Sequence, residues 1–347
     1  MNYSRVFVSG LGYELAPDII SSTQLEQRLQ PLYEKFRIPP GQLAALTGIE
    51  QRRWWPKGFK VSDGAVSAAR KALSASGVAI SDIGALIYTG VCREQHEPAT
   101  ACRVAAELGT SRQTVVYDIS NACLGVLSGM LDVANRIELG QIRAGVVVAC
   151  ESARDIVESS INKLLKVPTM QGFASTLATL TGGSGGVAVV LTDASLASAG
   201  AHKLRGATQL SAPEHNGLCH WGMAPAGEDL YRDEMRTDAV SLLKHGVALA
   251  QDTWQQFLTQ NAWSHEQVDK VICHQVGEAN RKQVLSALDI PVDKEFPTFA
   301  RLGNMGSVAL PASAAMASEQ GFLKPGDKVG FLGIGSGLNC MMLALEW

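Results

Sequence analysis

Three residues in separate loops of the sequence could together perform thioester chemistry. Cys123 lies where the strand-like run VVYDI turns through Ser-Asn-Ala into a segment with helical apolar spacing. His274 follows the apolar run VIC, and Asn304 lies in the turn LGNMGS. A thiol can act as a nucleophile, and an imidazole or an amide can polarise a carbonyl group. Taken singly, each residue also has an ordinary interpretation, as a core cysteine, a hydrogen-bonded histidine and a turn asparagine.

The position of Cys123 favours a reactive side chain. A strand-to-helix corner exposes a side chain above a sheet, and the N–H groups at a helix N-terminus favour a thiolate over a thiol. The apolar residues after Cys123 recur at steps of three and four, at Leu124, Leu127, Met130, Leu131, Ala134 and Ile137. We therefore predict a strand over 115–119 and a buried helix over 123–138.

The composition narrows the class of protein. The 347 residues can form two domains or one duplicated domain, and 46% hydrophobic residues predict a sizeable core. The net charge of -3 gives no sign of a nucleic-acid partner. No stretch approaches ~18 uninterrupted apolar residues, and the N-terminus lacks a signal-peptide pattern, so we expect no transmembrane segment. Seven cysteines without a C-x-x-C pair predict reduced thiols in the cytoplasm and no metal site.

Apolar strands alternate with helices in both halves of the chain, a pattern typical of an α/β fold whose sheet is covered on both faces. Strands are expected at 5–9 (ending at Gly10), 85–91, 144–151, 181–192, 268–275 and within 328–347. Helices are expected within 22–48 and at 62–76, 100–108, 238–260, 278–288 and 306–320. The polar and aromatic segment 47–55 is expected to be a surface loop, 160–180 a cap or dimer-facing region, and 194–202 a linker.

Two glycine-rich segments could suggest a nucleotide site. The segment 181–186 lacks the Lys-Ser/Thr ending of a phosphate-binding loop. GIGSG at 333–337 is followed by a strand-like run, whereas a dinucleotide fingerprint needs a helix there. No cofactor is therefore expected.

The motifs, taken in order, resemble the thiolase superfamily and specifically its ketoacyl synthase III branch. The resemblance covers essentially the whole chain and rests on LTGIEQRRW, DISNACLG, VICHQVGEAN, GNMGSVALPASAA and GIGSGLN. Within the branch, VCREQHEP and NACLG look most like OleA-type enzymes, which condense two fatty acyl-CoAs head to head in olefin biosynthesis. The resemblance implies a five-layered αβαβα fold with two pseudo-duplicated halves, 1–195 and 196–347, and a cap or dimer segment at about 155–182.

The resemblance also implies roles for individual residues. Cys123 would carry the acyl group, while His274 and Asn304 would stabilise the enolate of the second thioester. The backbone N–H groups of Cys123 and Ser336 would form the oxyanion hole for acylation. Glu97 would reach the active site of a partner subunit and remove the α-proton there, and an apolar tunnel would raise its pKa. The ordinary interpretation of Glu97 is an exposed loop carboxylate before a proline.

Several functions remain open at this level. The favoured one is an acyltransferase that makes a 2-alkyl-3-oxo acid from two long-chain acyl-CoAs through an acyl-cysteine. The alternatives are a decarboxylative 3-oxoacyl-ACP synthase III with a malonyl donor, a related secondary-metabolite ketosynthase, a thioesterase and a non-catalytic scaffold. The implied partners are acyl-CoA substrates, a second copy in a homodimer, and downstream pathway enzymes or an acyl carrier protein.

The sequence departs from the branch at the site that holds the CoA adenine. Typical members carry tryptophan and arginine before TGI, whereas Leu46 precedes Thr47 here. Four basic residues are candidates for contacting the CoA phosphates or are ordinary solvated charges, namely Arg52, Arg53, Lys203 and Arg205.

Overall fold

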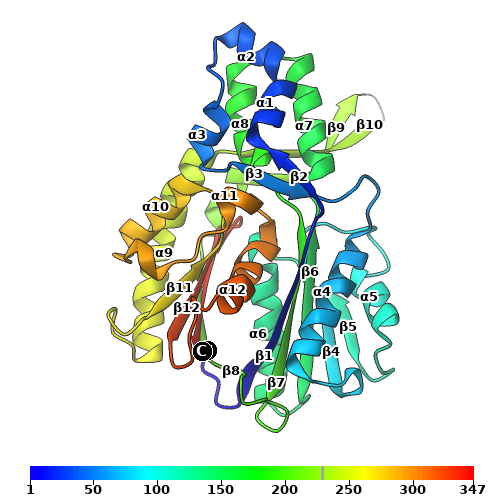
Figure 1. The fold of residues 1–347 in the computed structure, drawn as a ribbon, viewed down its shortest axis with the longest axis vertical. Helices are drawn as coiled ribbons and strands as arrows, with labels where there is room; N and C mark the ends of the chain where they lie inside the picture. The colour runs from blue at the N-terminus through cyan, green and yellow to red at the C-terminus, as the bar shows by residue number, and fades with distance from the viewer. Residues whose placement is uncertain (228–229) are drawn as a thin grey trace.

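A sheet of nine strands forms the centre of the computed structural model, which describes residues 1–227 and 230–347 (Figure 1). The strand order is β11-β12-β13-β8-β1-β7-β6-β4-β5. Their bounds are β1 (Val6–Leu15), β4 (Ile83–Tyr88), β5 (Val115–Asp118), β6 (Ala144–Glu151), β7 (Gly185–Asp193), β8 (His202–Ser211), β11 (Lys270–Cys273), β12 (Lys328–Gly335) and β13 (Asn339–Glu346). Only Phe7 and Val8 of β1 pair with β8, so two sheets, one from each half of the chain, are joined at a short seam.

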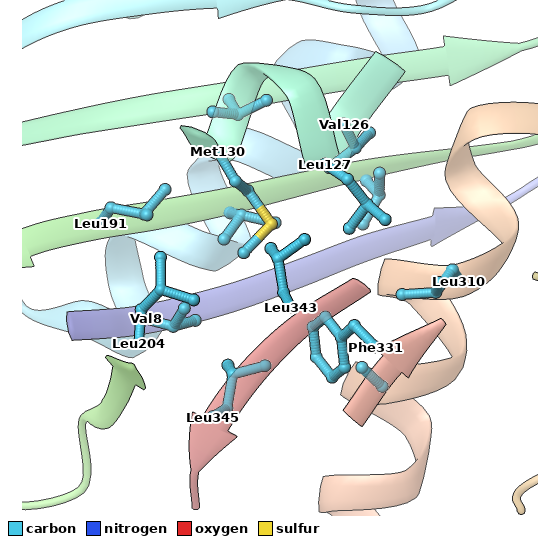
Figure 2. Close-up of a cluster of buried hydrophobic side chains, with 14 of the residues drawn as sticks. Val8, Val126, Leu127, Met130, Leu191, Leu204, Leu310, Phe331, Leu343 and Leu345 are labelled. Carbon is cyan, nitrogen blue, oxygen red and sulfur yellow. The ribbon is translucent and has the colours of Figure 1, made fainter. Parts of the chain in front are cut away.

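Two central helices, α6 (Gly125–Glu138) and α12 (Ala309–Glu319), contribute to one apolar core with strands of both sheets. Figure 2 shows part of this core, with Val8, Val126, Leu127, Met130, Leu191, Leu204, Leu310, Phe331, Leu343 and Leu345 labelled. Burying each such side chain contributes roughly 1.5–3 kcal/mol to folding. This core holds the two central helices, and the loops before them, in fixed positions.

Helices also cover the outer face of each sheet. The first sheet packs against α4 (Val61–Ser76) and α5 (Thr100–Leu108), and the second against α9 (Ala239–Asn261) and α10 (Glu278–Ala287). The order of layers is thus helix, sheet, helix, sheet, helix, which confirms the predicted αβαβα fold (Figure 1). The predicted domain boundary near 195 falls in the loop between β7 and β8.

A smaller group of elements, here called the cap, packs around its own apolar cluster above the sheets in Figure 1. It comprises α1 (Ser22–Arg28), α2 (Gln30–Phe36), α3 (Gln42–Thr47), α7 (Arg154–Lys166), α8 (Met170–Leu180), the pair β2 (Asp18–Ser21) and β3 (Gln51–Trp54), and the hairpin of β9 (Cys219–Gly227) and β10 (Leu230–Thr237). The short helix α11 (Phe299–Leu302) lies before α12. Among the described residues, no helix has both the length and the apolar character needed to cross a membrane.

Two local predictions are wrong. The first strand continues through Gly10 to Leu15, because Gly10 permits close packing rather than a turn. A Cβ atom at Gly10 would lie 2.3 Å from the backbone oxygen of Ala72 in α4. The segment 47–55 is not a surface loop, since 51–54 form β3 and Arg52 and Trp54 are buried. The Arg52 guanidinium donates hydrogen bonds to Ser22 Oγ and to the backbone oxygens of Ile20 and Leu180, while its Nε has no partner among the described residues.

Candidate active site

The nucleophile candidate lies on a strained turn. β5 ends at Asp118, residues 122–124 form one 3-10 turn, and α6 begins at Gly125. Ala122, directly before Cys123, has a φ of 45°, a left-handed conformation that costs a non-glycine residue roughly 1–2 kcal/mol. Gly125 packs against β4 so closely that a Cβ atom there would lie 2.1 Å from Thr89 O. Surrounding packing therefore holds Cys123 at the predicted corner, although the regular helix begins two residues after it.

Two cavities meet at Cys123. The α9 cavity has about 990 Å³ of empty space, adjoining solvent included, and is lined by His274 and by residues of α9 such as Leu242 and Val247. The α7 cavity has about 1110 Å³ of empty space, adjoining solvent included, and is lined by residues such as Glu151 and Ile156. Six residues line both cavities, namely Cys123, Ala178, Cys219, Met235, Asn304 and Ser336. The structure thus brings together four of the five predicted site residues, and Glu97 is the exception.

His274 follows the last residue of β11, and its backbone N–H donates to Leu332 O at 2.9 Å. Its Nδ1 atom is buried and has no hydrogen-bond partner among the described residues. Burial lowers the pKa of His274 to about 4, so the imidazole is neutral at pH 7. The next residue fixes this loop, because Gln275 Nε2 donates to the buried Glu295 carboxylate at 2.8 Å.

The side-chain amide of Asn304 has a defined orientation. Its Oδ1 accepts a hydrogen bond from Gly306 N at 3.0 Å, which leaves Nδ2 as the donor toward the cavities. Its backbone N–H donates to Thr181 O at 2.9 Å, and its backbone oxygen accepts from Gly183 N at 2.8 Å. The glycine-rich segment 181–186 therefore supports Asn304, a function that its sequence did not indicate.

Ser336 lies in the turn between β12 and β13, beside the nucleophile corner. A Cβ atom at the preceding Gly335 would lie 3.6 Å from Cys123 N, so the two backbones are neighbours. Asn339 Nδ2 donates to Asn121 Oδ1 at 3.0 Å and ties the two segments together. Asn121 and Asn339 were missed in the sequence, although each lies within three residues of a predicted site residue. The oxyanion role of the Ser336 N–H stays a prediction.

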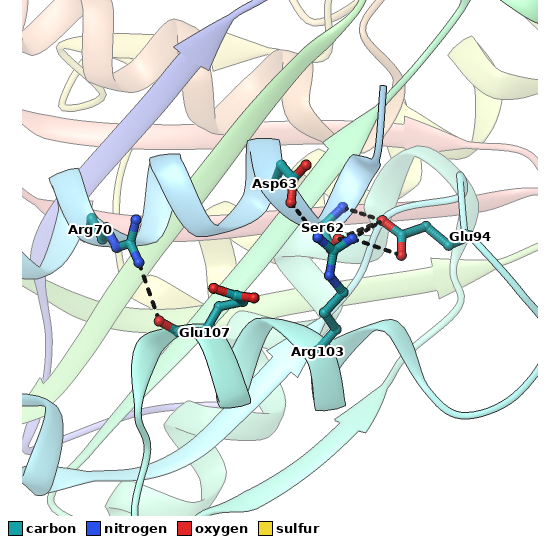
Figure 3. Close-up of polar contacts among 6 residues, drawn as sticks. All are labelled: Ser62, Asp63, Arg70, Glu94, Arg103 and Glu107. Carbon is teal, nitrogen blue, oxygen red and sulfur yellow. Dashed lines mark hydrogen bonds and ion pairs between the residues drawn. The ribbon is translucent and has the colours of Figure 1, made fainter. Parts of the chain in front are cut away.

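Glu97 is exposed and lines neither cavity of its own chain. It lies in the loop 89–99 between β4 and α5, here called the Glu97 loop. Figure 3 shows how Glu94 in this loop pairs with Arg103 of α5, at 3.2 Å, and contacts Ser62 of α4. Arg103 also pairs with Asp63 at 2.7 Å. The loop is therefore anchored to α4 and α5, while Glu97 is exposed and does not line the cavities of its own chain, and its role as a base stays a prediction.

The candidate phosphate contacts lie elsewhere. Arg52 is fully buried, and Arg53 donates to Ala16 O at 3.2 Å. Lys203 and Arg205 lie on β8, where Arg205 pairs with Glu346. None of these four lines either cavity. A different basic residue, Lys244, is exposed at an outer opening of about 1350 Å³, whose lining includes α9 residues that also line the α9 cavity.

The expectation of a stabilised thiolate is not met. Burial, with smaller effects from nearby Cys219 and Glu151, raises the pKa of Cys123 to about 12. A buried thiolate loses more hydration than the short turn before α6 restores. Cys123 is therefore a thiol at pH 7 and needs a proton acceptor, and the neutral imidazole of His274 can fill this role.

The resemblance implies that Cys123 is acylated, and these pKa values predict how that step depends on pH. His274 stays neutral and able to accept a proton until the pH falls to about 4, so acid inactivation should be centred near pH 4 and not near the ordinary 6.5. The check is the rate of Cys123 acylation between pH 4 and 9, followed by quenching and mass spectrometry. A midpoint near 6.5 would show that His274 is not desolvated during loading.

The fold and the Cys-His-Asn site define a condensing enzyme of the thiolase superfamily. Residues 258–347 match the family described as 3-oxoacyl-[acyl-carrier-protein (ACP)] synthase III C terminal. An acyl-CoA:acyl-CoA alkyltransferase from Shewanella oneidensis is 66% identical over 100% of both chains. A ketoacyl-[acyl-carrier-protein] synthase III from Halalkalibacterium halodurans is 26% identical over 99% of each chain. Cerulenin-bound OleA from Xanthomonas campestris superimposes with a TM-score of 0.93, at 34% identity, over 100% of this chain and 98% of that one. The chain belongs to the acyl-CoA:acyl-CoA alkyltransferase (OleA) family within the ketoacyl synthase III branch.

Proposed function

We propose that this protein joins two long-chain fatty acyl-CoAs in a non-decarboxylative Claisen condensation and releases a 2-alkyl-3-oxo acid. The observation that carries this proposal is the meeting of two cavities at Cys123, beside Asn304 and with His274 in one of them. Two cavities can accommodate two acyl groups whose reacting carbons meet at the thiol. The alkyltransferase from Shewanella oneidensis, at 66% identity, is also more similar to this chain than the ketoacyl synthase from Halalkalibacterium halodurans, at 26%.

The first half-reaction loads one acyl group. The Cys123 sulfur attacks the thioester carbonyl, and neutral His274 takes the thiol proton. The backbone N–H groups of Cys123 and Ser336 stabilise the tetrahedral oxyanion. The C–S bond to CoA then breaks, His274 returns the proton to the CoA sulfur, and acyl-Cys123 remains.

The second half-reaction forms the carbon–carbon bond. Glu97 of the partner subunit removes an α-proton from the second acyl-CoA, and His274 and Asn304 donate hydrogen bonds to the enolate oxygen. The carbanion attacks acyl-Cys123 and displaces the Cys123 thiolate, giving a 2-alkyl-3-oxoacyl-CoA. The thiolate takes up a proton as Glu97 gives up the α-proton, so that the thiol and the base are both regenerated. Water then cleaves this thioester to the acid and CoA.

Solved structures of Xanthomonas campestris OleA support the assignment of Glu97. They include variants substituted at a cysteine, at a histidine and at a glutamate. The substituted glutamate lies as far before the substituted cysteine in that chain as Glu97 lies before Cys123 in this one.

A homodimer would bring Glu97 to a second active site. β5 is the last strand of the sheet, and Val115 on it is 38% exposed, so this edge can pair with a second copy. The Glu97 loop connects β4 to α5, directly beside this edge. We infer that each subunit supplies Glu97 to its partner. The seven free cysteines are compatible with the reducing cytoplasm, where we place the protein.

The test is to supply myristoyl-CoA as the sole substrate and measure released CoA and product by mass spectrometry. We expect a 2-alkyl-3-oxo acid and about two CoA per product, as the two half-reactions require. Product that forms only with a malonyl donor would overturn the proposal in favour of decarboxylative synthesis. Free fatty acid alone would indicate a thioesterase, and failure of acyl-CoA or cerulenin to label Cys123 would indicate a scaffold.

A further inference from the structure

One buried carboxylate near Cys123 has no role in the reaction as described above. Glu151 ends β6, is 4% exposed and lines the α7 cavity. It forms no ion pair with any residue that the structure describes, and burial raises its pKa. A buried carboxylate is costly unless hydrogen bonds compensate for the lost hydration, so its partners indicate why it is there.

The partners of Glu151 belong to two segments of the active site. Oε1 accepts hydrogen bonds from Val91 N at 2.9 Å and from Ser307 Oγ at 2.5 Å, and Oε2 accepts one from Cys92 N at 3.0 Å. Val91 and Cys92 lie near the start of the Glu97 loop, and Ser307 follows Asn304 by three residues. One carboxylate therefore joins the base-carrying loop to the turn that carries Asn304.

The contact with the Asn304 turn extends to the backbone. A Cβ atom at Gly306 would lie 3.4 Å from the Glu151 carboxyl carbon, so the carboxylate packs directly against Gly306. The N–H of the same glycine donates to Asn304 Oδ1 at 3.0 Å and orients the side-chain amide. A movement of Glu151 would therefore be transmitted to the Asn304 donor.

The same hydrogen bonds argue against Glu151 as a second base. Two backbone N–H groups and one hydroxyl already donate to its oxygens, and each stabilises the ionised form over the protonated one. A proton acceptor must instead turn an oxygen lone pair toward the substrate.

We propose that Glu151 is a positioning residue for the condensation step, clamping the start of the Glu97 loop and the Asn304 turn in one geometry. This inference rests on the proposed function, because it assigns Glu97 and Asn304 to condensation. Loading of Cys123 depends on neither of these side chains, so loss of the Glu151 charge should not slow it. That charge helps to raise the pKa of Cys123, so its removal acts in the direction of faster loading.

The test is Glu151→Gln. This substitution keeps the size of the side chain but places an NH₂ group against one of the groups that donate to Glu151, namely Val91 N, Cys92 N or Ser307 Oγ. We expect Cys123 to be acylated stoichiometrically, while condensation of isolated acyl-enzyme with a second acyl-CoA falls at least about tenfold through misplacement. Ser307→Ala should reduce condensation in the same direction, and Ser307→Thr should restore it. The variant with both Glu151→Gln and Ser307→Ala should lose less condensation activity than the two single losses combined, because both substitutions act on one hydrogen-bond network.

Glu138→Gln is the matched control. Glu138 also accepts hydrogen bonds from two backbone N–H groups and a serine hydroxyl, those of Ser4 and Arg5, but lines neither cavity. The condensation rate of Glu138→Gln should equal that of the wild type. Both Gln variants are compared as intact dimers with their melting temperatures measured.

Three results would overturn the inference. Condensation at the control rate in Glu151→Gln would show that the clamp is not needed, and an equal loss of acylation would show a general structural defect. Glu151 would be a base if Glu151→Gln lost condensation and changed its pH profile while Ser307→Ala condensed at the wild-type rate. If Glu151→Gln does not fold, the condensation rates of Ser307→Ala and Ser307→Thr test the inference in its place. Wild-type protein that condenses only malonyl donors would refute the proposed function, and the Glu151 effect on the Asn304 turn would then be measured with those donors.

Discussion

An equal mixture of Glu97→Ala and Cys123→Ala subunits is expected to recover about a quarter of wild-type activity, because random pairing makes half the dimers mixed and each mixed dimer has one complete site of two. Each variant alone should lose condensation by roughly 10²–10⁴-fold or more, since it lacks either the base or the nucleophile. In the mixed dimer, Cys123 of one subunit meets Glu97 of the partner subunit. Glu97 is exposed on its own chain and does not line that chain's cavities, so it can act as the base only in the site of the partner subunit.

The measurement is product formation from myristoyl-CoA by co-expressed, differently tagged subunits. Glu97→Ala alone should still acylate Cys123 stoichiometrically, which separates loss of the base from loss of folding. His96→Ala is the matched control, because His96 is the adjacent exposed side chain in the same loop and should be dispensable. Mixed dimers without activity, or a normal condensation rate in Glu97→Ala, would rule out delivery of the base in trans.

The sequence predicts the positions of Cys123, His274 and Asn304 well, because each follows or precedes a strongly periodic element. Strands with continuous apolar residues and helices with apolar residues every three or four positions are specified locally. The helix predicted at 100–108 and the strand predicted at 144–151 therefore match the structure. The layered fold then places the ends of β5 and β11 and the turn before α12 around one point.

Properties set by tertiary contacts could not be predicted in this way. Glycine is common in turns, which is why the sequence predicts the end of a strand at Gly10. In the structure, Gly10 lies within the strand, and its lack of a side chain allows α4 to pack closely against it. An arginine is usually exposed, but Arg52 is buried, and backbone oxygens of the cap accept its hydrogen bonds. The pKa of Cys123 is raised and not lowered, because desolvation depends on what closes over the thiol and not on the helix that follows it. The clamp at Glu151 joins residues that are distant in sequence.

Gly125→Ala is expected to lower acyl loading of Cys123 by about 10²-fold or more, because it displaces the corner on which the thiol sits. The added methyl group would lie 2.1 Å from Thr89 O and 3.2 Å from its carbonyl carbon, and these are backbone atoms, one residue after β4, that cannot rotate away. We also expect a loss of roughly 3 kcal/mol in the free energy of unfolding, typical of overpacking a core. This loss opposes intrinsic propensity, since alanine in a helix is favoured over glycine by about 1 kcal/mol.

Two further substitutions make the test of Gly125 specific. Gly129→Ala lies one turn later in α6 and meets Val147 and Thr89 side-chain carbons at 2.6 and 2.8 Å, which can shift, so its effect on loading should be smaller. Among the residues that the structure describes, no atom lies within 4 Å of the new Cβ in Gly200→Ala, which should leave loading unchanged. The measurements are the acylation rate by mass spectrometry and the unfolding free energy by denaturant titration. Equal rates in all three variants would mean that Cys123 is placed by its own turn, with the strained Ala122, and not by the contact between α6 and β4.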